Sequence, residues 1–160
     1  MELQTRVMPM QELSELIALQ LQSGGVARLT VTGYSMLPLL RHGKDAVELT
    51  AVTGNEKKGD ILLYRRKNGQ FVLHRAIAEN PTGFVCCGDN QAEKENVDRE
   101  QLLGVVCGYL RGGKCYTLRY LPYRLYTAAW VGLFPLRRYY IAIRRRLGKL
   151  RSRLARRGVK

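Results

Sequence analysis

Apolar and polar residues alternate in short runs through the middle of the chain. In residues 26–32, Ala27, Leu29 and Val31 fall on one side of an extended segment, which is typical of a strand with one buried face. Residues that favour turns separate the runs, and Asn68-Gly69 is a strong hairpin signal. We therefore expect seven or eight strands, which include residues 26–32, 46–52, 61–64, 71–77, 84–87, 104–110 and 115–118.

This pattern predicts a mainly β protein with a compact, coiled, mostly antiparallel β-domain over residues 25–118. A short helix is expected before it in residues 9–22, where apolar residues recur at every fourth position and Gly24-Gly25 supplies a stop. We therefore assign residues 1–24 to an N-terminal helix that packs on the edge of the domain.

A different pattern begins near residue 121. Residues 120–140 are rich in Tyr and Leu and contain Trp130. Farther on, apolar residues follow at helical spacing among arginines, at Ile143, Leu147, Leu150 and Leu154. The pattern predicts that residues 119–160 form a basic amphipathic helical tail.

Charge separates this tail from the rest of the chain. Residues 1–118 hold 14 Lys/Arg and all 13 Asp/Glu, a net charge of +1, whereas residues 119–160 hold 13 Lys/Arg and no acidic residue. Such a segment attracts an anionic partner. Because the interfacial residues Trp130, Phe134, Tyr139 and Tyr140 accompany the arginines, we favour an anionic membrane surface over nucleic acid.

Targeting signals and cysteines change this picture little. No run reaches the ~20 apolar residues of a membrane-spanning helix, and no long apolar core follows Met1. We therefore expect no signal peptide and a peripheral membrane attachment, with the cytoplasmic face favoured. The cysteines have no metal-binding spacing, so we interpret them as small buried residues in a reducing compartment; they are Cys86, Cys87, Cys107 and Cys115.

Two residues carry candidate chemistry for nucleophilic acyl transfer. Ser35 follows a predicted strand, and Gly33 lets a substrate carbonyl approach the backbone near the Ser35 N–H, a candidate oxyanion donor. His74 lies in an alternating apolar strand, and the pKa of imidazole suits a general base near neutral pH. The other histidine, His42, lies in a polar turn and is interpreted as a surface residue.

An acid is also available for the histidine. Asp89 lies in a Gly-Asp-Asn turn, and Asp98 lies a few residues later. Either carboxylate is a candidate to hold the imidazole of His74 in the tautomer that a general base requires. Neither a metal nor a cofactor is expected.

Five segments, in order, resemble the sequence boxes of type I signal peptidases. Gly-Tyr-Ser-Met-Leu-Pro of this chain resembles the nucleophile box of that family. In Leu-His-Arg-Ala-Ile, a histidine stands where most bacterial enzymes have a lysine, which is typical of the archaeal, sporulation and endoplasmic-reticulum branch. The boxes are residues 33–38, 59–64, 73–77, 88–90 and 104–106.

The resemblance implies the coiled β fold of the signal peptidases. The repressor-type proteases share this fold but use a Ser–Lys pair in place of the Ser–His pair. The resemblance implies Ser35 as nucleophile, His74 as general base and Asp89 or Asp98 as the orienting acid. It also implies an oxyanion and substrate region around three residues of the nucleophile box, Gly33, Met36 and Pro38.

The chain departs from this family in two ways. Signal peptidases usually begin with a membrane anchor, which we do not expect here, and they need no arginine-rich tail. Either the C-terminus binds the membrane or the substrates bypass the usual secretion machinery. We expect a serine endopeptidase that cleaves signal or leader peptides of preproteins. The alternative is a catalytically silent, protease-like module whose basic tail binds anionic membrane or nucleic acid.

Overall fold

One antiparallel sheet of eight strands dominates the structure, a computed structural model that describes residues 10–137, 139–141 and 143–144. In the described part of the chain, α1 (Met10–Gln22), α2 (Leu121–Gly132) and a 3₁₀ turn, η1 (Arg99–Gln101), accompany the sheet, and further helical residues follow α2. The strands are β1 (Ala27–Thr30), β2 (Asp45–Thr50), β3 (Ile61–Arg65), β4 (Phe71–Asn80), β5 (Gly83–Cys87), β6 (Glu95–Asp98), β7 (Leu102–Arg111) and β8 (Lys114–Thr117). The expected mainly β, antiparallel architecture is thus confirmed.

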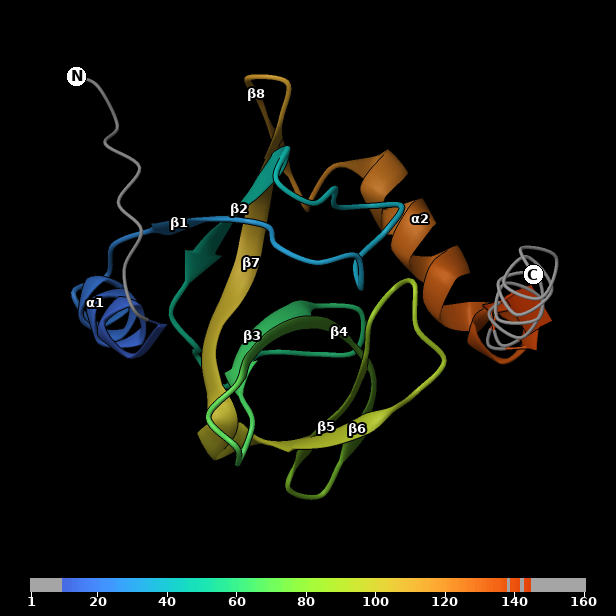
Figure 1. Ribbon diagram of the computed structural model, residues 1–160, viewed down its shortest axis with the longest axis horizontal. Helices are drawn as coiled ribbons and strands as arrows, with labels where there is room; N and C mark the ends of the chain where they lie inside the picture. The colour runs from blue at the N-terminus through green and yellow to red at the C-terminus, as the bar shows by residue number, and fades with distance from the viewer. Residues whose placement is uncertain (1–9, 138, 142, 145–160) are drawn as a thin grey trace, which may run out of the picture.

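The long strand β7 joins the two halves of the sheet. Its later residues pair with β2 and β8, and its first residues pair with β3, giving the order β1-β2-β7-β3-β4-β5-β6 with β8 on β7. Figure 1 shows β3 to β6 curling round into a half-barrel below the β1–β2–β7 part. The sequence pattern missed β6, which pairs with β5 and forms the last strand of this half-barrel.

Glycines with positive φ set the tight turns. Gly69 ends the turn between β3 and β4 with a φ of 85°, as the Asn-Gly signal predicted. Gly112 and Gly113 both have positive φ, 57° and 78°, which is the backbone that a two-residue hairpin loop between β7 and β8 requires.

The two faces of the β3–β4 hairpin belong to two different cores. Leu62, Tyr64 and Val72 lie on one face, in a core inside the half-barrel with Phe84 and Val97. On the other face, Ile61 and Leu63 belong to the larger core, which β1, β2, β7 and both helices help to form. Because side chains alternate along a strand, consecutive residues of β4 enter different surroundings. This alternation positions the candidate site.

The two helices lie at opposite sides of the view in Figure 1, and both contribute to the larger core. Ile17 and Leu21 of α1 are buried, and a Cβ on Gly104 of β7 would lie 2.9 Å from Leu21 Cδ1, so this glycine permits the close approach. Neither α1 nor α2, within the described part of the chain, has the length and apolar character needed to span a bilayer. Most of the helix expected from Ile143 onward lies outside the described residues.

The inner side of α2 and of the helical residues that follow it packs on the β-structure. Tyr123 joins the larger core, and Phe134 forms a small cluster with Ile77 and Cys87. Ile141 is buried as well. The aromatic residue Phe134, which the sequence suggested for a membrane interface, is therefore 6 % exposed and faces the protein.

Candidate active site

A cavity of about 460 Å³ opens between the segment after β1 and the start of β4. Ser35 and His74, which are 39 positions apart in the sequence, both line it. Its volume falls in the range of small-ligand and peptide pockets, about 300–1,000 Å³. The whole lining consists of Val31–Met36, Arg66, Gln70–His74 and Asn90–Gln91.

Ser35 sits in a turn whose backbone is set by its neighbours. Gly33 has a φ of +89°, a conformation that favours glycine, and Met36 is 2 % exposed, anchored in the larger core. Ser35 itself is half-buried. Met36 lines the cavity as well, whereas Pro38 is exposed and is not among the lining residues.

Two groups brace the backbone around Ser35. The Asn90 N–H donates to the Ser35 carbonyl at 2.7 Å, and the Asn90 side-chain amide donates to the Tyr34 carbonyl at 3.2 Å. On the other side, the Gly33 N–H donates to His42 Nδ1 at 2.9 Å. His42 is exposed, as expected, but its ring also lies 5.0 Å from the ring of Tyr34.

The turn that carries Asn90 approaches the serine very closely. A Cβ built on Gly88 would lie 2.8 Å from the Ser35 carbonyl oxygen and 3.0 Å from Ser35 Cβ. A glycine is therefore required at position 88 for the two turns to touch. The Gly-Asp-Asn turn thus positions Ser35 through backbone contacts.

Two polar groups of Ser35 have no partner among the described residues. Within the described part of the chain, neither its N–H nor its hydroxyl makes a hydrogen bond. The Gly33 N–H is already used by His42, whereas the Ser35 N–H is a candidate donor for an oxyanion in this turn.

His74 is held by its Nδ1 atom. The residue is 3 % exposed, with Nδ1 2.9 Å from Glu95 Oε1 and 3.1 Å from the Tyr64 hydroxyl. An ionised carboxylate only accepts hydrogen bonds, so Nδ1 carries the proton and Nε2 keeps its lone pair. No residue among those described hydrogen-bonds to Nε2.

Burial lowers the pKa of His74 below its usual value near 6.5, and the charge of Glu95 opposes this only in part. The imidazole is therefore neutral at pH 7 and able to accept a proton.

Glu95 is itself fixed in its ionised form. Arg66 donates to both of its oxygens, from Nε to Oε2 at 2.7 Å and from Nη2 to Oε1 at 2.8 Å, and the Tyr64 hydroxyl donates to Oε1. Partial burial acts to raise the pKa of Glu95, but these hydrogen bonds and the nearby charges lower it to about 2. The carboxylate is thus charged at any pH at which His74 is neutral.

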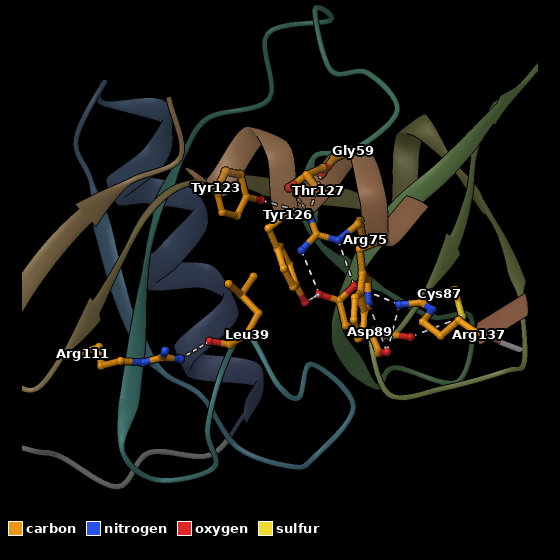
Figure 2. Close-up of polar contacts among 12 residues, drawn as sticks. Leu39, Gly59, Arg75, Cys87, Asp89, Arg111, Tyr123, Tyr126, Thr127 and Arg137 are labelled. Carbon is orange, nitrogen blue, oxygen red and sulfur yellow. Dashed lines mark hydrogen bonds and ion pairs between the residues drawn. The ribbon is translucent and has the colours of Figure 1, made fainter. Parts of the chain in front are cut away.

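Neither aspartate expected to orient His74 does so. Asp89 forms a two-bond ion pair with Arg75, Oδ1 to Nε at 2.9 Å and Oδ2 to Nη2 at 2.8 Å, and both side chains are fully buried (Figure 2). Asp98 accepts a hydrogen bond from the Thr82 hydroxyl at 2.7 Å. The carboxylate that hydrogen-bonds to His74 is that of Glu95 instead.

Figure 2 shows the polar contacts that surround Arg75 and Asp89. The third guanidinium nitrogen of Arg75, Nη1, donates to the Gly59 carbonyl, the Tyr123 hydroxyl and the Thr127 hydroxyl at 2.9–3.2 Å. Asp89 also accepts a hydrogen bond from Tyr126, through Oδ2. This cluster joins β4, the Gly-Asp-Asn turn and α2, and it leaves no group open to a substrate.

Arg137 adds a second cation beside Asp89. It donates to the Asp89 backbone carbonyl at 2.9 Å, and its guanidinium lies over the rings of Trp130 and Phe134 at 4.8 and 5.1 Å. Its Nε and Nη2 atoms make no hydrogen bond, and burial lowers its pKa. The ring faces cover the charge instead.

Sequence reasoning missed Glu95, Arg66 and Tyr64. Glu95 lies in a polar stretch with other acids, and only the pairing of β6 with β5, which sets Glu95 opposite Cys86, brings it to His74. A strand signal around Val97 was the one available hint. Tyr64 was part of a recognised box. It lies two residues after Leu62, which pairs with His74, so Tyr64 and His74 lie on the same face of the sheet.

The cysteines and acidic residues supply no metal site. Within the described residues, no group of three or more His, Cys, Asp or Glu side chains has an arrangement that holds a metal ion. All four cysteines are free; Cys86 and Cys87 are buried as expected, whereas Cys115 is exposed. Burial raises the pKa of the Cys86 thiol to about 12, so it does not form a thiolate near neutral pH.

No protein-family model matches this chain, and a search among curated proteins finds no relative.

Proposed function

We propose that this protein is a serine endopeptidase of the signal-peptidase type, in which Ser35 is the nucleophile and His74 the general base. The observation that carries the proposal is the shared cavity: Ser35 and His74 both line it, and Nδ1 of His74 is held by an ionised acid. This is the arrangement of nucleophile, base and orienting acid that acyl transfer requires.

The reaction follows from these groups. Ser35 Oγ attacks the carbonyl carbon of a peptide bond while its proton passes to His74 Nε2, and the Ser35 N–H stabilises the oxyanion. The C–N bond then breaks, and His74 returns the proton to the leaving amine. A water molecule, deprotonated by the same nitrogen, hydrolyses the acyl-enzyme. Glu95 acts as a positioning residue that stabilises the imidazolium formed at each step.

The edge of β4 beside the cavity favours an extended peptide as substrate. Among the described strands, only β3 pairs with residues Phe71 to His74, because β5 begins its pairing at Arg75. The first part of β4 therefore has a free edge next to the lining of the cavity. A peptide strand added at this edge would gain main-chain hydrogen bonds and bring its scissile bond toward Ser35.

The second candidate is a catalytically silent module that binds peptides in the same cavity. It is supported by one observation: the Ser35 hydroxyl makes no hydrogen bond to His74 or to any other described residue. Catalytic hydrogen bonds are often formed only with bound substrate, so the endopeptidase remains our choice.

Peptide cleavage separates the two candidates. The full chain is incubated with a library of leader-like peptides, and the products are identified by mass spectrometry. We expect cleavage by the wild type and by Ser23→Ala, a control serine at the end of α1, and none by Ser35→Ala. Equal cleavage by Ser35→Ala would overturn the proposal, and peptide binding without cleavage by the wild type would favour the silent module.

A further inference from the structure

The outward side of α2 and of the helical residues after it is aliphatic, which is unusual for a surface helix. Leu121 and Leu125 are 63 % and 61 % exposed, and Leu136 is 69 % exposed. We call this surface the outer face; its exposed members are Leu121, Leu125, Leu133, Leu136, Tyr139, Tyr140 and Ile143. Leu121 and Leu125 lie one helical turn apart on α2, and the other five members belong to the stretch that follows the end of α2 at Gly132.

The inner side of the same segment is fully engaged, which fixes the outer face toward the outside. Trp130 Nε1 donates to the Asp89 carbonyl at 3.2 Å, and the Tyr126 hydroxyl donates to the Asp89 carboxylate at the same distance. Tyr123, Phe134 and Ile141 are buried. Turning the leucines inward would break this buried network, so within the described residues nothing covers them.

Charge identifies the kind of partner that fits. Residues 119–160 carry 13 Lys/Arg and no acidic residue. Arg119 and Arg124 are exposed beside the first leucines of the outer face. A second copy of the chain would bring the same positive charge to the contact and be repelled. Nucleic acid would pair with the arginines and stack on Tyr139 and Tyr140, but it would leave the aliphatic side chains of the outer face in water.

We propose that the outer face is a docking surface for an anionic lipid bilayer. The leucines enter the boundary between headgroups and acyl chains, and the arginines lie at the level of the lipid phosphates. Each basic side chain near an anionic leaflet favours binding by about 1 kcal/mol. This docking is independent of Ser35 and His74, and a protein without peptidase activity retains it.

Co-sedimentation of the full chain with vesicles tests this surface. One vesicle contains equal parts of phosphatidylglycerol and phosphatidylcholine, and the other contains phosphatidylcholine alone. The test variant is Leu125→Glu with Leu136→Glu, at leucines that are 61 % and 69 % exposed. The matched control is Leu16→Glu with Leu19→Glu, which adds the same two negative charges at leucines that are 50 % and 63 % exposed on α1, at the opposite side of Figure 1 from α2. All proteins also carry Ser35→Ala, so that the result does not depend on activity.

We expect the control to bind anionic vesicles as tightly as the protein that carries Ser35→Ala alone. The test variant should bind roughly a hundredfold more weakly, about tenfold for each leucine removed from the acyl boundary. Binding to phosphatidylcholine alone should be weak. Added salt should release the control protein from anionic vesicles, which supplies a second measurement that needs no change in the leucines.

Three outcomes would overturn the proposal. The first is equal vesicle binding by the test variant and the control. The second is tight binding to single-stranded RNA that displaces the vesicles and is unaffected by the leucine changes, which would make the tail a nucleic-acid ligand. The third is a dimer in sedimentation velocity that the leucine changes dissociate, which would make the outer face a contact between two copies.

Discussion

His74 and Arg75 are neighbours on β4, and each is the centre of a buried polar cluster. The His74 cluster lies on the inner face of the half-barrel, where Tyr64, Arg66 and Glu95 surround one ring nitrogen. The Arg75 cluster lies on the other face, where Asp89 and the residues of α2 surround the guanidinium.

The two clusters differ in what they leave unused. The Arg75 guanidinium donates from all three of its nitrogens to described residues, and its partner Asp89 is fully buried. The His74 cluster is satisfied at Nδ1 alone and borders a cavity, so Nε2 has no partner among the described residues. A closed cluster stabilises a fold, whereas a cluster with one open nitrogen next to a cavity can take part in a reaction.

His74→Ala should produce the largest effect. The change removes the proposed base, and in serine peptidases the loss of the histidine lowers kcat by about 10⁴- to 10⁶-fold. Steady-state cleavage of a leader peptide measures it. The free energy of unfolding should fall far less than in the Arg75 variant described below; a His74→Ala protein with unchanged kcat would remove the distinction between the two clusters.

Glu95→Gln should come next. Gln still fills the site but cannot stabilise the imidazolium, so kcat/KM should fall by about 10³- to 10⁴-fold. The carboxylate charge of Glu95 raises the pKa of His74, so its loss should move the acid limb of the pH–rate profile to lower pH.

In the wild type, that acid limb should already lie below about pH 6.5, because burial lowers the pKa of His74 and the neutral base persists to lower pH. Asp98→Asn is the matched control, since its carboxylate contacts Thr82 rather than His74. A fall in activity for Asp98→Asn equal to that for Glu95→Gln would show that the orienting acid is misassigned.

Arg75→Met should act on stability. The change leaves the carboxylate of Asp89 buried without its main partner, and breaking a buried ion pair in this way costs about 3–5 kcal/mol. Urea denaturation followed by circular dichroism gives the free energy of unfolding. Arg28→Met is a control, because its ion pair with Glu48 is exposed and should contribute less than about 1 kcal/mol. Similar losses for the two variants would contradict the closed-cluster interpretation.

Gly88→Ala should have a smaller effect that connects the two clusters. The added Cβ would meet the Ser35 carbonyl at 2.8 Å and displace the serine, and a shift of about 1 Å at a reacting atom costs on the order of 10²-fold in rate. The comparison is Gly132→Ala, where nothing lies within 4 Å of the new Cβ. If kcat is the same in both variants, the Gly-Asp-Asn turn does not position the nucleophile.

The sequence predicted the strands and the nucleophile turn because their signals are local. Alternating apolar residues and glycine turns marked seven of the eight strands, and the Asn-Gly hairpin follows from backbone preference alone. These features depend on residue types within a few positions. The approach of Ser35 and His74 to one cavity does not, because the two residues are 39 positions apart; only the resemblance of the boxes implied that they act together.

The orienting acid was not predictable in this way. Asp89 belongs to a recognised box, but which residue of β4 it contacts depends on the face of the strand that it approaches. It approaches the face that carries Arg75, not the face that carries His74. Glu95 reaches His74 only through the register of a short polar strand, in which Cys86 pairs with Glu95. A shift of one residue in this pairing would turn Glu95 to the opposite face, and no local pattern specifies that register.

The most direct test of the central claim is the reaction of the full chain with a fluorophosphonate, which phosphonylates an activated serine hydroxyl with loss of fluoride. Peptide mapping by mass spectrometry should find the label on Ser35 in the wild type and in Ser23→Ala. The rate of labelling should fall at least about 10²-fold in His74→Ala, because the hydroxyl loses its base. Labelling at another serine, or an equal rate in His74→Ala, would contradict the account.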